Sequence, residues 1–387
     1  MFTFPIFNAL FQTKSLGKAN NGQPKVALVV GVTGIVGNSL AKILSRPDAP
    51  GGPWKVYGIA RRPQPRYFAE SPIEYIQCNV FDAFDTQEKI SSLRDVTHLF
   101  WVMCVGQRTE ERNFHDGNMF RNVIDALLLN ARSLQHIVLQ TGGEHYFGSF
   151  TLDRMNEAIP EPPFQEDLAR LPISNIYYTL EDILFDIVKK KEALTWSIHR
   201  PNAILGFSPW SLMNVLGSLA VYASICKFEG SSFTFPGNRV TWEQCGDVAD
   251  AELIAEQEIW ACLEPNAKNQ AFNISNGDVF SYKRVWSLLA TQFGLEVPPY
   301  NEHPISLQEA MKGKDDVWDA IVAKYDLIPT KLENVGNWWL IDHLLNLPYL
   351  PVLSMNKSKG LGFLGYRDTE ASILHWIDSM RLKKIIP

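Results

Sequence analysis

The sequence predicts an α/β fold: a Rossmann-type doubly wound parallel sheet followed by a smaller, mainly helical region. Three observations support this prediction. Apolar strands alternate with helical stretches from residue 26 to about residue 204, a glycine-rich turn joins the first strand to the first helix, and the alternation weakens after about residue 205. Strands that alternate with helices form a parallel sheet with right-handed crossovers, since each helix packs back across the sheet.

The first predicted strand, Val26–Val30, is the continuous apolar run VALVV, which is typical of a strand buried on both faces. A helix over Asn38–Ser45 follows the glycine-rich turn. Five further strands are expected at Trp54–Ala60, Ile73–Cys78, Thr97–Val105, His136–Gln140 and Leu194–His199, with helices such as Asn118–Asn130 and Thr179–Glu192 between them.

Helical segments separated by loops that contain proline and glycine dominate the rest of the chain. They are expected at Ser211–Cys226, Cys245–Leu263, Ser281–Phe293 and Asp368–Met380. The sequence therefore predicts three parts: a flexible N-terminal arm over residues 1–24, a nucleotide-binding Rossmann domain over residues 25–204, and a mainly helical substrate-binding region over residues 205–387 that packs on it.

The composition is that of a globular protein, because 46% of the 387 residues are hydrophobic and 20% are charged. The net charge of −6 and the lack of a basic block argue against nucleic acid as a partner. Five scattered cysteines without a C-x-x-C pair argue against a disulfide framework and against a zinc site. They favour a reducing compartment, and we expect a cytoplasmic protein.

Two apolar stretches do not predict a membrane span. The first ten or so residues are too few to cross a bilayer and lack the basic residues of a secretory signal. The segment Pro201–Cys226 carries no charge, but Pro209, Asn202 and Asn214 interrupt it, and it also contains several serines and glycines. We therefore interpret this segment as buried interior and as the wall of an apolar cavity.

A glycine pattern after the first strand predicts a dinucleotide site. Gly31, Gly34 and Gly37 have the Gly-x-x-Gly-x-x-Gly spacing directly between a strand and a helix. The first glycine permits the tight turn, the second lets backbone amides approach a pyrophosphate, and the third lets the helix pack on the strand. The N-terminus of the helix then faces the phosphates.

The end of the second strand indicates which dinucleotide is bound. Enzymes that use NAD usually carry an acid there to hold the ribose 2′-hydroxyl. This chain instead continues with Arg61 and Arg62, whose guanidinium groups can bind a 2′-phosphate bidentately. The sequence therefore predicts NADPH/NADP+, with Asn79, after the third strand, near the adenine.

The usual catalytic motif of short-chain reductases, Tyr-x-x-x-Lys, is absent, since no tyrosine has a lysine four residues later. The nearest substitute is the segment NIYYTLED, residues 175–182, at the start of a helix. It is accompanied by QTGGEHY, residues 140–146, at the end of the fifth strand.

These segments resemble the plant progesterone 5β-reductase and iridoid synthase family, a divergent branch of extended short-chain dehydrogenase/reductases. The resemblance runs from about residue 26 to the C-terminus. It rests on GVTGIVGNSL, GGPWKVYGIARRP, EYIQCNV, NMFRNV, LQTG-x-x-HY, YYTLEDIL, TWSIHRP, GFSPWSLMN, AKNQAFNISNGDVF and SMNKSKGLGFLG. It implies an NADPH-dependent oxidoreductase that reduces the C=C bond of an enone or enal, a Δ4-3-oxosteroid in one type and 8-oxogeranial in the other.

The resemblance also implies site residues. It places the catalytic tyrosine at Tyr177, with Tyr178 as the alternative. The implied cofactor contacts are Thr33, Gly34, Ile35, Arg61, Arg62, Asn79, Val80, Met103, Cys104, Gln140, Tyr177, Ile204, Ser211, Leu212 and Met213. Among these, Asn79 stands where the family commonly has Asp, and Met103 and Cys104 stand where it has Thr or Ser followed by Trp.

The main departure is Glu144, which occupies the position of the family's catalytic lysine. A carboxylate raises the pKa of a nearby tyrosine, whereas the lysine lowers it. Conjugate reduction depends less on such a lysine than carbonyl reduction does. Hydride goes to the β-carbon, and a neutral Tyr177 hydroxyl can stabilise the charge on the carbonyl oxygen.

Two hypotheses therefore stand. The first is an active NADPH-dependent 1,4-reductase, and the second is a catalytically impaired paralogue that binds NADPH. Carbonyl reduction or alcohol oxidation is disfavoured by the missing lysine.

The expected partner is a small apolar enone or enal, and a homodimer is a possible oligomeric state. Candidate pocket-wall residues are Phe147, Trp101, Trp210, Met213 and Trp338, whereas His145 and Tyr146 are expected to be packed residues rather than substrate contacts.

Overall fold

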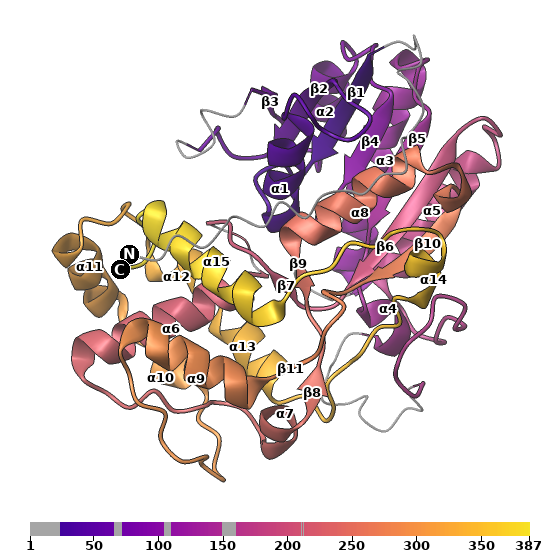
Figure 1. Ribbon diagram of the computed structural model, residues 1–387. Coiled ribbons are helices and arrows are strands. Elements are labelled where there is room, and N and C mark those ends of the chain that lie inside the picture. The colour runs from indigo at the N-terminus through magenta and orange to yellow at the C-terminus, as the bar shows by residue number, and fades with distance from the viewer. Residues whose placement is uncertain (1–23, 66–71, 104–109, 149–159, 210, 212) are drawn as a thin grey trace.

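A computed structural model describes residues 24–65, 72–103, 110–148, 160–209, 211 and 213–387, and a seven-stranded sheet forms its N-terminal part (Figure 1). The spatial order is β10-β6-β5-β4-β1-β2-β3, and every neighbouring pair is parallel. The strands are β1 (Lys25–Val30), β2 (Trp54–Ala60), β3 (Glu74–Gln77), β4 (His98–Trp101), β5 (His136–Gln140), β6 (Thr195–Pro201) and β10 (Gln270–Ile274).

The strand order reverses between β1 and β4, because the chain builds outward from β1 in both directions. In open α/β sheets ligands bind outside the carboxyl ends of the strands at such a switch point. The fold therefore positions a site where β1, β4 and β5 end.

Helices cover both faces of the sheet, and alternate residues of β1 bury into the two layers. Ala27 and Val29 belong to the core on the side of α1 (Ile35–Leu44) and α8 (Ala251–Leu263). Leu28 and Val30 belong to the core on the opposite side. The helices of that second side are α2 (Ala83–Ile90), α3 (Glu110–Asn130) and α5 (Ile176–Val188). The predicted doubly wound α/β fold is confirmed.

The seventh strand and its helix come from the region in which the sequence predicted mainly helices. The helix expected over Cys245–Leu263 begins only at Ala251, because the Asp250 carboxylate caps it by accepting from the amides of Glu252 and Leu253. The preceding residues form the short strands β8 (Cys245–Gly246) and β9 (Ala249–Asp250). After α8 and a 3₁₀ turn, β10 pairs with β6 and extends the sheet.

The C-terminal region packs beside the carboxyl ends of the sheet around α6 (Val215–Glu229) (Figure 1). Its short strands β7 (Ile204–Leu205) and β11 (Phe280–Ser281) pair with β9 and β8. The remaining helices are α4 (Glu144–Phe147) beside β5, then α7 (Arg239–Glu243), α9 (Tyr282–Phe293), α10 (Leu307–Ala310), α11 (Asp315–Lys324), α12 (Leu332–Val335), α13 (Trp338–Leu345), α14 (Asn356–Gly360) and α15 (Thr369–Leu382).

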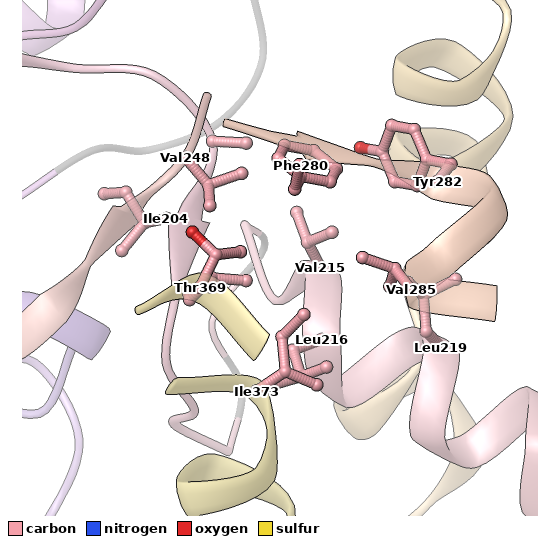
Figure 2. A pocket seen from close by; sticks show the side chains of 12 residues that line it. Ile204, Val215, Leu216, Leu219, Val248, Phe280, Tyr282, Val285, Thr369 and Ile373 are labelled. Carbon is pink, nitrogen blue, oxygen red and sulfur yellow. The ribbon is translucent and has the colours of Figure 1, made fainter. Parts of the chain in front are cut away.

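Helix α6 is the centre of this region, since all residues from Val215 to Cys226 are buried. At its N-terminal end, Val215, Leu216 and Leu219 line a small apolar cavity, shown in Figure 2, that side chains from β7, α9 and α15 complete. Most of the described residues of the uncharged segment are thus buried, and several of them line a cavity, as predicted. Within the described ranges, no helix has the length and apolar character needed to cross a membrane.

Candidate active site

The glycine turn lies at the carboxyl end of β1 and leads directly into α1. Gly31 has φ +94°, and the amides of Gly31 and Val32 both donate to the Ile59 carbonyl at 3.0 and 3.1 Å. A Cβ at Gly37 would lie 2.1 Å from the Gly31 carbonyl oxygen, so only glycine lets α1 begin this close to the strand. No side chain caps α1, whose first amides therefore suit an anionic ligand.

A segment from beyond β7 holds the middle of this turn in place. Ser208 donates from its hydroxyl to the Thr33 carbonyl, and a Cβ at Gly206 would lie 2.4 Å from Cγ2 of Ile35. The predicted cofactor residues Thr33, Gly34 and Ile35 thus form one cradle with residues 206–208. Tight packing against Gly206 leaves this cradle little freedom to move.

The two arginines follow β2, and both are exposed. Side chains of β3 hold the backbone of both arginines. The Tyr75 hydroxyl donates to the Arg62 carbonyl at 2.6 Å, and the side-chain amide of Gln77 donates to the Arg61 carbonyl at 3.3 Å. The two guanidinium groups therefore extend from a backbone that is held in place. Such an arrangement suits the binding of a phosphate group at the end of β2.

Asn79 and Val80 come next, directly after β3. The Asp85 carboxylate accepts from the Asn79 amide at 2.7 Å, and the Val80 carbonyl accepts from the Asn122 side chain at 3.0 Å. Both residues lie on the same edge of the sheet as the glycine turn and the arginines, since they follow a neighbouring parallel strand.

A cavity opens beyond the ends of β4 and β5, on the side of α3 and α5. Its walls are formed by Trp101, Met103, Asp116, Met119, Gln140, Thr141, Ile176, Tyr177 and Leu180. Met103 also lies against the glycine turn, since a Cβ at Gly31 would be 3.2 Å from its backbone. The structure thus brings Met103, Gln140 and Tyr177 together around one cavity, and their contact with a cofactor remains a prediction.

The residues present fit a dinucleotide cofactor. The glycine cradle offers backbone amides without a side-chain cap, and the Gln140 Oε1 atom is buried without a hydrogen-bond partner in the described parts of the chain. A buried acceptor of this kind suits a polar group of a ligand at the same edge. The Rossmann fold implies a nicotinamide cofactor here.

Tyr177 lies in the first turn of α5 with its ring buried. Its hydroxyl rests on the backbone after β5, because a Cβ at Gly142 would lie only 2.7 Å from that oxygen. Gly142 therefore creates the space for the hydroxyl, and the hydroxyl lies where β5 ends beside the cavity.

Tyr178 has a different role. Its hydroxyl donates to the His145 carbonyl at 2.6 Å and accepts from the Leu171 amide at 3.0 Å. Burial raises the pKa of this phenol. The Tyr178 hydroxyl thus both donates and accepts within the protein, which indicates a structural role for this residue.

Glu144 is the first residue of α4 and is half-buried. Its carbonyl accepts from the Asn175 side-chain amide at 2.9 Å and from the Gly148 amide at 2.8 Å. The structure thus joins Glu144 to the residue that precedes α5, and so brings it to the start of the helix that carries Tyr177.

His145 and Tyr146 are packed residues, as predicted. His145 Nδ1 lies 3.2 Å from Glu181 Oε1, and burial lowers the histidine pKa. The Tyr146 hydroxyl donates to Asn273 Oδ1 at 2.5 Å and accepts from Arg200 at 3.1 Å, while burial raises its pKa to about 12.

A buried ionic network beneath α4 was missed by the sequence analysis. Glu181 is 2% exposed and accepts from Arg200 at 3.0 Å and from Arg170 at 2.9 Å. Burial alone would raise the pKa of this carboxyl, but the His145 hydrogen bond and the Arg200 charge hold it at about 2. One signal was available: Glu181 lies at the spacing of the buried residues of α5, one turn after Tyr177, and is the one charged residue among them.

The other predicted residues lie in several places. Phe147 packs on Phe164 and Tyr349 beside α4, and Trp338 of α13 packs against the helical core. Ile204 begins β7 and lines the cavity of Figure 2 rather than the one beside Tyr177. The Ser211 amide donates to the Ser208 carbonyl, and the Met213 carbonyl accepts from Val215 at the start of α6. Cys104, Trp210 and Leu212 lie outside the described residues.

Solved structures share this fold at low sequence identity. A UDP-glucose 4-epimerase from Thermotoga maritima superposes with a TM-score of 0.61 at 13% identity, covering 92% of this chain and 99% of its own. A UDP-glucuronic acid 4-epimerase from Bacillus cereus gives 0.60 at 14% identity, covering 92% and 99%. These similarities support the Rossmann architecture alone.

Curated relatives are much more similar. A 3-oxo-Δ4,5-steroid 5β-reductase of Arabidopsis thaliana is 52% identical over 364 residues, covering 94% of this chain and 93% of the relative. An (S)-8-oxocitronellyl enol synthase of Nepeta cataria is 52% identical over 373 residues, covering 96% and 95%. The enzyme of the same name from Catharanthus roseus is 49% identical, covering 94% and 92%. The profile of the PRISE-like Rossmann-fold domain matches residues 73–387, and the chain belongs to this family.

Proposed function

We propose that this protein catalyses the NADPH-dependent 1,4-reduction of the C=C bond of an enone or enal. The observation that carries the proposal is the Tyr177 hydroxyl, which rests on Gly142 at the carboxyl end of β5 beside a cavity. Relatives of about 50% identity that cover nearly the whole chain are named as a steroid 5β-reductase and as 8-oxocitronellyl enol synthases, which supports a reductase of conjugated double bonds.

NADPH, when bound, would supply the hydride that adds to the β-carbon of the substrate and would leave as NADP+. Negative charge then gathers on the carbonyl oxygen. The Tyr177 hydroxyl donates a hydrogen bond to that oxygen and so stabilises the enolate in the transition state. Because the Tyr178 hydroxyl is used by His145 and Leu171, it is not available for this task.

The preference for NADPH rests on Arg61 and Arg62, whose backbone is anchored from β3. Both guanidinium groups are exposed at the end of β2, where a 2′-phosphate would lie in a Rossmann fold. No acid follows β2 at this position, so the 2′-hydroxyl of NAD lacks its usual partner.

Two substrate classes are candidates: a Δ4-3-oxosteroid, after the name of the Arabidopsis relative, and the acyclic enal 8-oxogeranial, which the family resemblance implies. Both are apolar molecules with a conjugated carbonyl. The cavity beside Tyr177 is lined by the apolar side chains of Trp101, Met119 and Leu180 among others, which supports an apolar substrate.

The alternative, an NADPH-binding paralogue without useful turnover, rests on Glu144 alone. It is not favoured, because conjugate reduction needs a hydrogen-bond donor for the enolate and Tyr177 provides one without a lysine. The cytoplasm is the proposed location, supported by the thiols of Cys78, Cys226, Cys245 and Cys262, which form no disulfide in the structure.

Steady-state turnover tests the proposal. Progesterone, 8-oxogeranial and a small cyclic enone are each offered with NADPH and with NADH, and cofactor binding is measured separately by fluorescence. We expect turnover of at least one substrate, faster with NADPH. Tight NADPH binding without turnover of any of the three would instead establish the impaired paralogue.

A further inference from the structure

The side chain of Asn175 joins the two segments that carry Tyr177 and Glu144. It precedes α5, and its Oδ1 atom accepts from the Tyr177 amide at 2.9 Å. Its Nδ2 atom donates to the Glu144 carbonyl at 2.9 Å. The amide orientation is fixed by these partners, since a backbone N–H can only donate and a carbonyl can only accept.

Capping accounts for only one of the two hydrogen bonds of the Asn175 side chain. Serine, threonine and aspartate also cap helices by accepting from a backbone amide. A serine or threonine hydroxyl accepts and donates through a single oxygen close to the backbone, whereas asparagine holds its acceptor and its donor on separate atoms of a longer side chain. Asn175 is 8% exposed, so the loss of either bond would leave a backbone group poorly solvated.

Two further contacts join the same two segments. Tyr178 donates to the carbonyl of His145, which directly follows the residue whose carbonyl is held by Asn175. The Tyr177 hydroxyl lies against Gly142. Three contacts therefore hold the segment of residues 142–145 against the start of α5.

We propose that Asn175 is a positioning residue for catalysis, which sets the Tyr177 hydroxyl against the segment of Gly142 to Glu144. The inference rests on the proposed function, in which that hydroxyl stabilises the enolate. An oxyanion donor is effective only when it is aimed where charge develops, and an error of about 1 Å can cost on the order of 10²-fold in rate.

The chain contains a matched control. Asn238 precedes α7, accepts from the Thr241 amide at 2.9 Å, and donates to the Leu347 carbonyl at 2.9 Å. Its two hydrogen bonds are of the same kinds as those of Asn175, but it belongs to no part of the proposed site. Asn175→Ser and Asn238→Ser each keep a capping oxygen and lose the amide donor.

The experiment compares the two serine variants with the original protein, each made alone and in a Tyr177→Phe background. We expect similar losses of Tm, but only Asn175→Ser lowers kcat on an enone, about tenfold, with NADPH affinity within twofold of the original. In the Tyr177→Phe background Asn175→Ser has less than a twofold effect, because no hydroxyl is left to misplace. Equal kcat losses in both serine variants, or an undiminished loss in the Tyr177→Phe background, would overturn the proposal.

A failure of the proposed function gives a different pattern. In that case the original protein is inactive, or Tyr177→Phe leaves kcat unchanged. The positioning role is then tested by following tyrosine ionisation in the ultraviolet as the pH is raised. The titration of the Tyr177→Phe variant is subtracted to isolate the signal of Tyr177. Asn175→Ser should shift the titration of Tyr177 and Asn238→Ser should not, whereas two unshifted titrations reject the role.

Discussion

Arg200 and Glu181 form an ion pair inside the protein, with 3.0 Å between Nη2 and Oε1 and with 5% and 2% of the two residues exposed. The pair connects β6 to α5 directly behind the segment that carries Glu144 and His145. Two charges this deeply buried stabilise the fold only as long as each has its partner, since water cannot replace either one.

Glu181→Gln is expected to lower the free energy of unfolding by about 3–5 kcal/mol, because it leaves the Arg200 charge buried without its counterion. Urea unfolding at pH 7 measures this loss. Glu243→Gln, which removes the exposed pair with Arg239, serves as the control and should cost about 0.5 kcal/mol or less. Equal effects of the two variants would contradict a structural role for the buried pair.

The same carboxyl group contributes to acid stability. Its pKa is about 2 in the folded protein against an ordinary value of 4.5, so its stabilisation is present above pH 4.5 and is lost as the pH falls toward 2. The difference in unfolding free energy between the original protein and Glu181→Gln should therefore shrink over this range. A difference that stays constant from pH 5 to pH 3 would show that the charge of Glu181 does not matter.

Asp247 is expected to make the pH dependence of stability opposite to that contributed by Glu181. Burial raises the pKa of this carboxyl to about 7, although it accepts from the Leu353 amide and from Asn202. The folded protein then binds more protons than the unfolded chain, so the contribution of Asp247 to stability falls as the pH rises from about 4 to 7. The stability of Asp247→Asn, measured relative to the original protein, should therefore rise across this interval, and a flat difference would refute the prediction.

Tyr177→Phe should lower kcat on an enone by about 10²–10³-fold while NADPH affinity is nearly unchanged, since the hydroxyl acts on charge that develops in the transition state. Steady-state kinetics and fluorescence titration measure the two quantities. Tyr178→Phe should instead lower Tm, because it leaves the His145 carbonyl and the Leu171 amide without their partner. If Tyr178→Phe is the variant that loses turnover and keeps its Tm, the two tyrosines have exchanged roles.

Arg62→Glu should weaken NADPH binding by about 1.5–3 kcal/mol, since a charge-assisted hydrogen bond to the 2′-phosphate is lost. NADH binding should change much less, because NADH has no phosphate at this position. The ratio of kcat/KM with the two cofactors checks the prediction. An unchanged ratio would mean that the arginines after β2 do not contact the cofactor.

Glu144→Lys should raise kcat on enones about tenfold, which corresponds to about 1.4 kcal/mol of barrier. A positive charge near Tyr177 favours the developing enolate and lowers the pKa of the tyrosine in the pH–rate profile. NADPH affinity should change little, because a carboxylate can also accept hydrogen bonds from the ribose hydroxyls. If the original protein has a high kcat and Glu144→Lys lowers it, the site depends on the carboxylate of Glu144 for catalysis.

The sequence predicted those parts of the fold and site that depend on local pattern. The VALVV strand, the glycine turn and the arginines after β2 are each encoded within a few consecutive residues. In the structure the turn and the arginines follow the paired strands β1 and β2 and so lie at the carboxyl ends of neighbouring strands. The family resemblance is likewise confirmed by the profile match and by the relatives. The placement of Tyr177 as the reactive residue remains a prediction that the geometry supports.

What the sequence did not predict depends on contacts between distant residues. The Tyr146 hydroxyl meets Asn273 across 127 positions of sequence, and no local pattern indicates that partnership. Strand β10 was missed because it is only five residues long, contains Asn273, and is stabilised by its pairing with β6 rather than by an apolar run. The bond from Asn175 to the Glu144 carbonyl likewise joins residues 31 positions apart, which no local pattern indicates.

The chain returns to the sheet at β10 after it has already built helices of the C-terminal region. The sheet and the C-terminal region therefore cannot be separated by a single cut of the chain. After β6 the chain leaves to build α6 and α7, comes back for α8 and β10, and leaves again for α9 (Figure 1). A fragment that ended at residue 204 would expose the backbone of Ser197–Pro201, which β10 pairs in the intact protein. An open edge of this kind is a template for pairing with other chains, so the helical part protects the nucleotide-binding part from aggregation.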